Sequence, residues 1–146
     1  MKGKLKFVIP LVVLILIGGG YKFVLAKPAP VKKKVEGAVY VLPKEFLINL
    51  SDSHFAKLSV ALVIPEADAA AMAGGGEAAT PPEGYGALPQ EAAVRAVITD
   101  TVTDAKASDL TNRKRRAKLR DQVLKAIKAH TDVKAHDVLF TDVAVQ

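Results

Sequence analysis

The fold is decided by residues 38–65, which read AVYVLPKEFLINLSDSHFAKLSVALVIP. In the second half of this stretch apolar and polar side chains alternate, which is the pattern of a strand with one buried face. The apolar members of that face are Ala56, Leu58, Val60, Leu62 and Ile64. Phe46, Ile48 and Leu50 begin the same pattern earlier, and the Ser51-Asp52-Ser53 cluster between the two patterns favours a turn. We therefore expect two strands joined as a hairpin.

Two helices are predicted after the hairpin. Pro89-Gln90-Glu91 places a proline in a first helical turn and an acid near the positive end of the helix dipole. The first helix runs to about Asp104 with an apolar stripe of Val94, Val97, Ile98, Thr101 and Val102. Ser108 or Asp109 is the expected N-cap of the second helix, and Thr131-Asp132 ends it. The buried stripe of this second helix is Leu119, Val123, Leu124 and Ile127.

A third strand is predicted at the C-terminal end, where residues 133–146 read VKAHDVLFTDVAVQ and are rich in β-branched side chains. Its expected buried face alternates through Leu139, Thr141, Val143 and Val145. The order strand, strand, helix, helix, strand predicts an α+β domain, in which helices pack on one face of a small mixed or antiparallel sheet.

Residues 66–88 separate the hairpin from the first predicted helix. They are rich in alanine and contain Gly74-Gly75-Gly76 and Pro81-Pro82. We expect an exposed, flexible insertion, with a brief helix at most over Ala67–Ala73.

Charge is distributed unevenly along the chain of 146 residues, whose net charge is +6. Residues 1–37 hold eight lysines and one acidic side chain, whereas residues 38–146 hold 13 basic and 14 acidic side chains. A near-neutral domain is not typical of nucleic-acid binding, so no nucleic-acid partner is expected. The chain has no cysteine, which excludes disulfides and thiolate metal sites.

The basic N-terminal segment surrounds an apolar stretch. Residues 7–26 read FVIPLVVLILIGGGYKFVLA, with Lys22 as the single charge, and a helix of this length spans about 30 Å, the thickness of a bilayer core. We expect a cytoplasmic basic tail at 1–6, a transmembrane anchor at 7–26, a linker at 27–37 and an exported domain at 38–146. The predicted anchor, through which the chain contacts membrane lipids, includes Phe7, Leu11, Leu14, Ile17, Tyr21 and Leu25.

A cleavable signal peptide is the alternative to the anchor. Lys2, Lys4 and Lys6 form a charged start, Phe7–Ile17 an apolar core, and Val24-Leu25-Ala26 a small-residue cleavage pattern. Cleavage after Ala26 would release a secreted, soluble binding domain. The lysines on both sides of the apolar stretch do not decide its orientation, but the short tail and the absence of cysteine favour an exported C-terminal domain.

The residue pattern predicts no catalytic, cofactor-binding or metal-binding site. Asp52, Ser53 and His54 are adjacent in a predicted turn and cannot adopt the geometry of a hydrolase triad. His130 and His136 lie near Asp132 and Asp137, but no known metal motif surrounds them. We therefore expect a protein that is not an enzyme and needs no cofactor.

A dense basic cluster at Arg113–Arg120 holds six of the 13 positive charges of residues 38–146. It is either a solvated helix face or an electrostatic docking surface for an acidic partner, for lipid headgroups or for a second copy. A second copy could contribute the acidic stretch Asp100–Asp104. The candidate assembly surface consists of Arg113, Lys114, Arg115, Arg116 and Arg120.

Four segments of the chain resemble the flagellar basal-body-associated FliL family. They are Phe46-Leu47-Ile48-Asn49-Leu50, Leu58-Ser59-Val60-Ala61-Leu62, the Pro89–Thr103 helix and, most specifically, the ending Val138-Leu139-Phe140-Thr141-Asp142-Val143-Ala144-Val145-Gln146. The order of a basic tail, one span, a linker and a C-terminal domain is also similar to that family.

The resemblance implies a single-pass protein of the bacterial inner membrane, with an exported domain similar to the stomatin-type fold. It implies a ring around the ion-driven stator complex of the flagellar motor, which supports torque in swimming or swarming, and no catalytic residues. It also favours the anchor over the signal peptide. The 66–88 insertion is longer and the Arg113–Arg120 cluster denser in charge than the family leads us to expect, so no family role is transferred to either.

Overall fold

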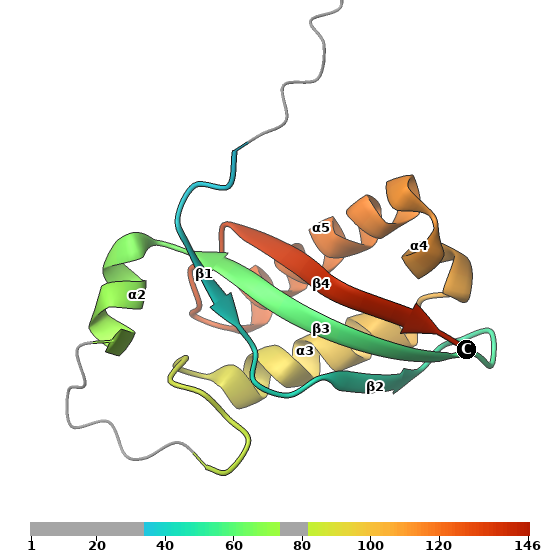
Figure 1. The fold of residues 1–146 in the computed structure, drawn as a ribbon, viewed down its shortest axis with the longest axis horizontal. Coiled ribbons are helices and arrows are strands. Elements are labelled where there is room, and N and C mark those ends of the chain that lie inside the picture. Colours follow the sequence, from blue (N-terminus) through green and yellow to red (C-terminus); the bar gives the residue numbers. More distant parts are fainter. Residues whose placement is uncertain (1–33, 74–81) are drawn as a thin grey trace, which may run out of the picture. The chain divides into compact units, whose positions relative to one another are not determined.

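The computed structural model describes residues 34–73 and 82–146, and Val35–Gln146 form one compact unit (Figure 1). Within these residues the chain forms an α+β domain of four strands and four helices. Their order is β1 (Ala38–Val41), β2 (Phe46–Asn49), β3 (Phe55–Ile64), α2 (Glu66–Ala73), α3 (Glu91–Thr103), α4 (Ala107–Thr111), α5 (Arg113–His130) and β4 (Asp137–Val145).

The expected anchor over 7–26 and its six named side chains lie outside the described residues. Among residues 34–73 and 82–146, no helix is both long and apolar enough to cross a membrane.

Strand β3 is the centre of an antiparallel sheet. Strand β4 pairs along one of its sides, whereas β1 and β2 share the other, β1 beside the end of β3 and β2 beside its start. The predicted hairpin is confirmed as β2 and β3, with Phe46 opposite Leu58. The separate strand β1 was not predicted, and Pro43, which has no N–H to donate to a ladder, lies in the break between β1 and β2.

Helices α3 and α5 cover one face of this sheet, and in Figure 1 both lie behind it. Every second residue of β3, from Ala56 to Ile64, is buried on that face. The helices contribute the two predicted stripes, of which Val94, Ile98 and Val102 on α3 and Leu119, Val123 and Ile127 on α5 are fully buried. Burial of each large apolar side chain is worth about 1.5–3 kcal/mol, so these stripes hold the two layers together.

The predicted face of the last strand is correct for its second half and wrong for its first. In β4, Asp142 pairs with Ser59 but Phe140 pairs with Val60, so Thr141 is an extra residue, a β-bulge. One extra residue exchanges the two faces of a strand. Val143 and Val145 therefore pack against the core as expected, but before the bulge Val138 and Phe140 do so in place of Leu139.

Candidate assembly surface

The basic cluster forms the first two turns of α5, which begins at Arg113. The expected caps Ser108 and Asp109 are not the N-cap of this helix, because both lie in the short preceding helix α4. Asn112 is the N-cap, and its Oδ1 accepts hydrogen bonds from the backbone N–H groups of Lys114 (3.0 Å) and Arg115 (3.2 Å). The cap therefore fixes the place where the basic side chains begin.

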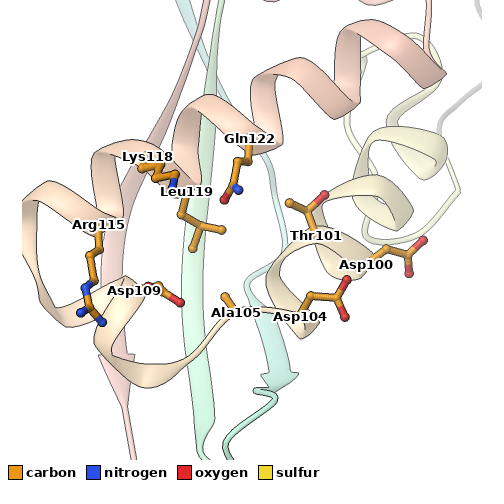
Figure 2. Close-up of a pocket in the computed structure, with 9 residues that line it drawn as sticks. All are labelled: Asp100, Thr101, Asp104, Ala105, Asp109, Arg115, Lys118, Leu119 and Gln122. Atoms are coloured by element: carbon orange, nitrogen blue, oxygen red, sulfur yellow. The ribbon is translucent and has the colours of Figure 1, made fainter.

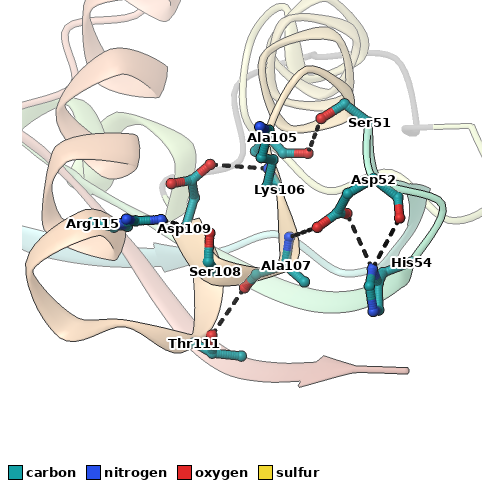
Figure 3. Close-up of polar contacts among 10 residues, drawn as sticks. All are labelled: Ser51, Asp52, His54, Ala105, Lys106, Ala107, Ser108, Asp109, Thr111 and Arg115. Atoms are coloured by element: carbon teal, nitrogen blue, oxygen red, sulfur yellow. Dashed lines mark hydrogen bonds and ion pairs between the residues drawn. The ribbon is translucent and has the colours of Figure 1, made fainter.

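The five residues of the candidate assembly surface divide into two groups. Arg115 donates from Nη1 to Ser108 Oγ (2.7 Å), and Arg116 donates from Nη1 to the carbonyl of Leu110 (2.8 Å). These two arginines hold the corner between α4 and α5, where Figure 3 shows Arg115 beside Ser108. Arg113, Lys114 and Arg120 make no side-chain hydrogen bond or ion pair with another described residue, so within this surface they are the residues that remain available to a partner.

Helix α5 concentrates positive charge at its N-terminal end. Its first turn contains no acidic residue, and the N-terminus of a helix already carries a positive partial charge. Four successive cations there are unfavourable for the helix alone, and the buried stripe of α5 stabilises the helix against this repulsion. The consequence is a strongly electropositive surface at one end of the helix layer.

A cavity of about 600 Å³ lies beside this surface, between α3, α4 and α5 (Figure 2). Its lining includes the carboxylates of Asp100, Asp104 and Asp109 together with Arg115 and Lys118. No ion pair within 4.0 Å joins these groups across the cavity in the described part of the chain. The acidic stretch that we expected to meet the basic cluster of another copy thus lies next to it in the same chain.

The turn between β2 and β3 attaches the α3–α4 corner to the sheet (Figure 3). Ser51 donates both its N–H and its hydroxyl to the carbonyl of Ala105 (2.9 Å each), and Asp52 Oδ2 accepts the N–H of Ala107 (3.0 Å). His54 Nδ1 lies 3.3 Å from Asp52 Oδ1. Desolvation acts to raise the pKa of Asp52, but the hydrogen bond from Ala107 and the nearby His54 together hold it below its usual value. Asp52 thus holds the corner through Ala107, and His54 lies beside Asp52.

A second polar site, around Glu91, was not predicted beyond its place at the helix end. The Glu91 side chain is only 3% exposed, and its Oε2 accepts hydrogen bonds from the Tyr40 hydroxyl and the Gly86 N–H, both at 2.8 Å. Tyr40 in turn accepts the N–H of Leu88 (3.3 Å), and burial together with the bond to Glu91 raises the pKa of Tyr40 to about 12. A side chain at position 86 would collide with the Tyr40 hydroxyl, which explains the glycine there.

The other oxygen of this carboxylate, Glu91 Oε1, is buried and has no hydrogen-bond partner among the described residues. Glu91 also lines an open groove of about 900 Å³ between α2, the start of α3 and the residues after α5. Two separate places on the domain, the basic end of α5 and this groove, therefore have the chemistry of a binding site.

The comparison with protein families agrees with the resemblance of the four segments. The family described as "Flagellar basal body-associated protein FliL" matches residues 39–146, which begin in β1 and end with the last residue of the chain. A comparison with curated proteins gives no match. Because the family match covers residues 39–146, which is more than half of the chain, the chain belongs to the FliL family of flagellar basal body-associated proteins.

Proposed function

We propose that this protein is a membrane-anchored component of the flagellar motor that associates with the stator complex and supports torque. The observation that carries the proposal is the family match over residues 39–146, since the family is associated with the flagellar basal body. The role in this proposal is structural rather than catalytic, and polar contacts such as Asp52–Ala107 and Arg115–Ser108 hold the corners of the domain.

The anchor is the second part of the proposal. An apolar segment at 7–26 flanked by lysines fits a single span of the bacterial inner membrane, with the C-terminal domain on its outer side. The linker at 27–37 reaches at most about 40 Å when extended, so the span would keep the domain close to the membrane.

Self-assembly is the third part. Copies of the domain would form a ring around the stator, and the electropositive end of α5 is the candidate contact surface. Of the candidate assembly surface, Arg113, Lys114 and Arg120 are the residues expected to meet a partner, since Arg115 and Arg116 are bonded within the chain.

Deletion of the gene tests the proposal. We would follow the swimming speed of single cells as the viscosity of the medium rises, and count flagellar filaments in the same cells. A stator role predicts normal filaments and a speed that fails at high load, with recovery when the full gene is returned. Loss of filaments would instead indicate a role in building the flagellum, and unchanged speed at every load would contradict a role in torque.

The mass of the protein in the cell decides between the anchor and the secreted alternative. A chain that begins at or near Met1 and sediments with membranes supports the anchor. A soluble chain that begins at Lys27 would show cleavage after Ala26 and would contradict the anchor.

A further inference from the structure

The groove at Glu91 combines apolar walls with negative charge. Its apolar lining includes Ile64, Met72, Leu88 and Val133, which belong to four separate parts of the domain. Its ionisable groups are three acids, Asp68, Glu91 and Asp132, and one base, Lys134. A groove of this kind is suited to a partner that has apolar surface and a positive charge.

Glu91 provides an independent observation, a buried carboxylate oxygen without a donor among the described residues. A buried carboxylate is stable only when it is paired or fully hydrogen-bonded. Glu91 has two donors on Oε2, none on Oε1, and no basic side chain within 4.0 Å in the described residues. A cation held in the groove would attract the Glu91 carboxylate, and the attraction would be strong because the apolar walls lower the local dielectric constant.

The same domain carries unpaired cations at the opposite end of α5. Asp132, Val133 and Lys134 of the groove directly follow the C-terminal end of this helix, whereas Arg113 and Lys114 form its N-terminal end. An 18-residue helix separates the two ends by about 27 Å. One chain therefore cannot bring its own basic end into its own groove, but two chains can meet in this way.

We propose that the groove at Glu91 binds the basic N-terminal end of α5 from a second copy of this chain, so that copies join head to tail. This rests on the self-assembly proposed above and identifies its two surfaces. Contacts between two different surfaces are heterologous, and they close into a ring when the rotation between copies allows it. The alignment also brings the positive end of one α5 towards the negative end of the next.

Cysteine cross-linking tests this arrangement, because the natural chain has no cysteine. Lys114 is exposed at the basic end of α5, and Ala92 is exposed on the wall of the groove. We would make Lys114→Cys, Ala92→Cys and the double variant in the full chain, oxidise membranes of producing cells, and separate the products without reductant. The matched control joins Lys114→Cys to Leu47→Cys, an exposed position on the open face of the sheet.

The proposal predicts a ladder of dimers and larger multimers for the Lys114→Cys, Ala92→Cys double variant, with none for either single variant or the control pair. Dimers from either single variant would show that like surfaces meet, and a ladder from the control pair would show unspecific collision; each overturns the proposal. Multimers detected by sedimentation in detergent without the ladder would overturn this interface and leave self-assembly standing. A monomer in both measurements would overturn self-assembly as well.

Glu91→Gln tests the charge at the bottom of the groove. Glutamine keeps an oxygen that can accept from Tyr40 and Gly86, so the change removes charge with little change of shape. In the background of the double-cysteine variant, we expect the rate of ladder formation to fall about tenfold. An unchanged rate would show that the Glu91 carboxylate has no part in the contact.

Discussion

The two faces of the central sheet differ in what they require of their side chains. On the face covered by α3 and α5, Leu58, Val60 and Leu62 of β3 are 0% exposed. On the other face, Leu47 is 81% and Phe55 65% exposed, although both are large and apolar. Among the described residues of this face, Ala61 and Val63 are the buried ones, and they lie between β1 and β4. Apolar character alone therefore does not mark the core of this domain, whereas the register of the strands does.

The largest effect is expected at Val138 and Leu139, neighbours in β4 on opposite faces. Val138→Asp places a charge in the core and should unfold the domain, at a cost of about 3–5 kcal/mol. Leu139→Asp should cost about 1 kcal/mol, because Leu139 is only half-buried on the open face. Denaturant unfolding of the full chain in detergent and resistance to protease measure both. Equal loss of stability in the two variants would contradict the bulge at Thr141.

An intermediate loss of stability is expected for a change at Tyr40 in β1, and a smaller one for a change at its neighbour Val39. Tyr40→Phe removes the donor to Glu91 Oε2 and the acceptor for Leu88 N–H, and should cost about 1–3 kcal/mol. Val39 is 51% exposed on the open face, so Val39→Thr should stay within about 0.5 kcal/mol of the natural chain.

The pH dependence of unfolding separates this network from simple packing. The pKa of Tyr40 rises from 10.0 in the unfolded chain to about 12, so the neutral hydroxyl is the form that the fold stabilises. This stability is complete below pH 10 and is lost as the pH rises towards 12, because over this range the unfolded chain releases its tyrosine proton while the folded chain still holds it. The difference between the natural chain and Tyr40→Phe should therefore shrink over this range. A constant difference would show that the lost stability comes from shape alone.

A smaller effect is expected at Asp52, in the turn that joins the sheet to the helix layer. Asp52→Asn keeps an acceptor for the Ala107 N–H but removes the charge beside His54, so the melting temperature at pH 7 should fall slightly. The lowered pKa of Asp52 means that this contribution exists above its ordinary pKa of 3.8 and is lost as the pH falls through the lower folded value. Thermal melts at pH 7 and pH 3 measure it, with the exposed Asp121→Asn as the control. If the melting temperatures of Asp52→Asn and the natural chain differ by the same amount at both pH values, the Asp52 charge has no role in stability.

Local patterns predicted the elements of the fold but not the contacts that join them. Alternation located β2 and β3, and helical spacing located the stripes of α3 and α5, because each pattern depends on near neighbours in sequence. The bulge at Thr141 depends instead on how β4 pairs with β3, which no local pattern contains.

The candidate sites likewise depend on contacts that local sequence patterns do not contain. The basic cluster is visible in the sequence, but Ser108, Asp109 and Asn112 are all good capping residues, and only the folded chain selects Asn112. The Glu91 site unites Tyr40 and Glu91 across 51 positions, so the sequence alone showed nothing more than an acid at a helix start.

A small effect of the opposite sign is expected at the basic end of α5. Arg113→Glu combined with Lys114→Glu places acids in the first turn of a helix that has none there, which should stabilise the domain by about 0.3–1 kcal/mol per residue. The same change removes the exposed cations and should weaken self-association, as measured by sedimentation of the full chain in detergent. Arg116→Glu is the matched control, because it also reverses a charge but loses the bond to the Leu110 carbonyl and should destabilise the α4–α5 corner. If the double reversal raises stability and leaves association intact, the cluster is a solvated helix face. If association falls while stability rises, the natural chain keeps these cations for contact with a partner at the expense of its own helix.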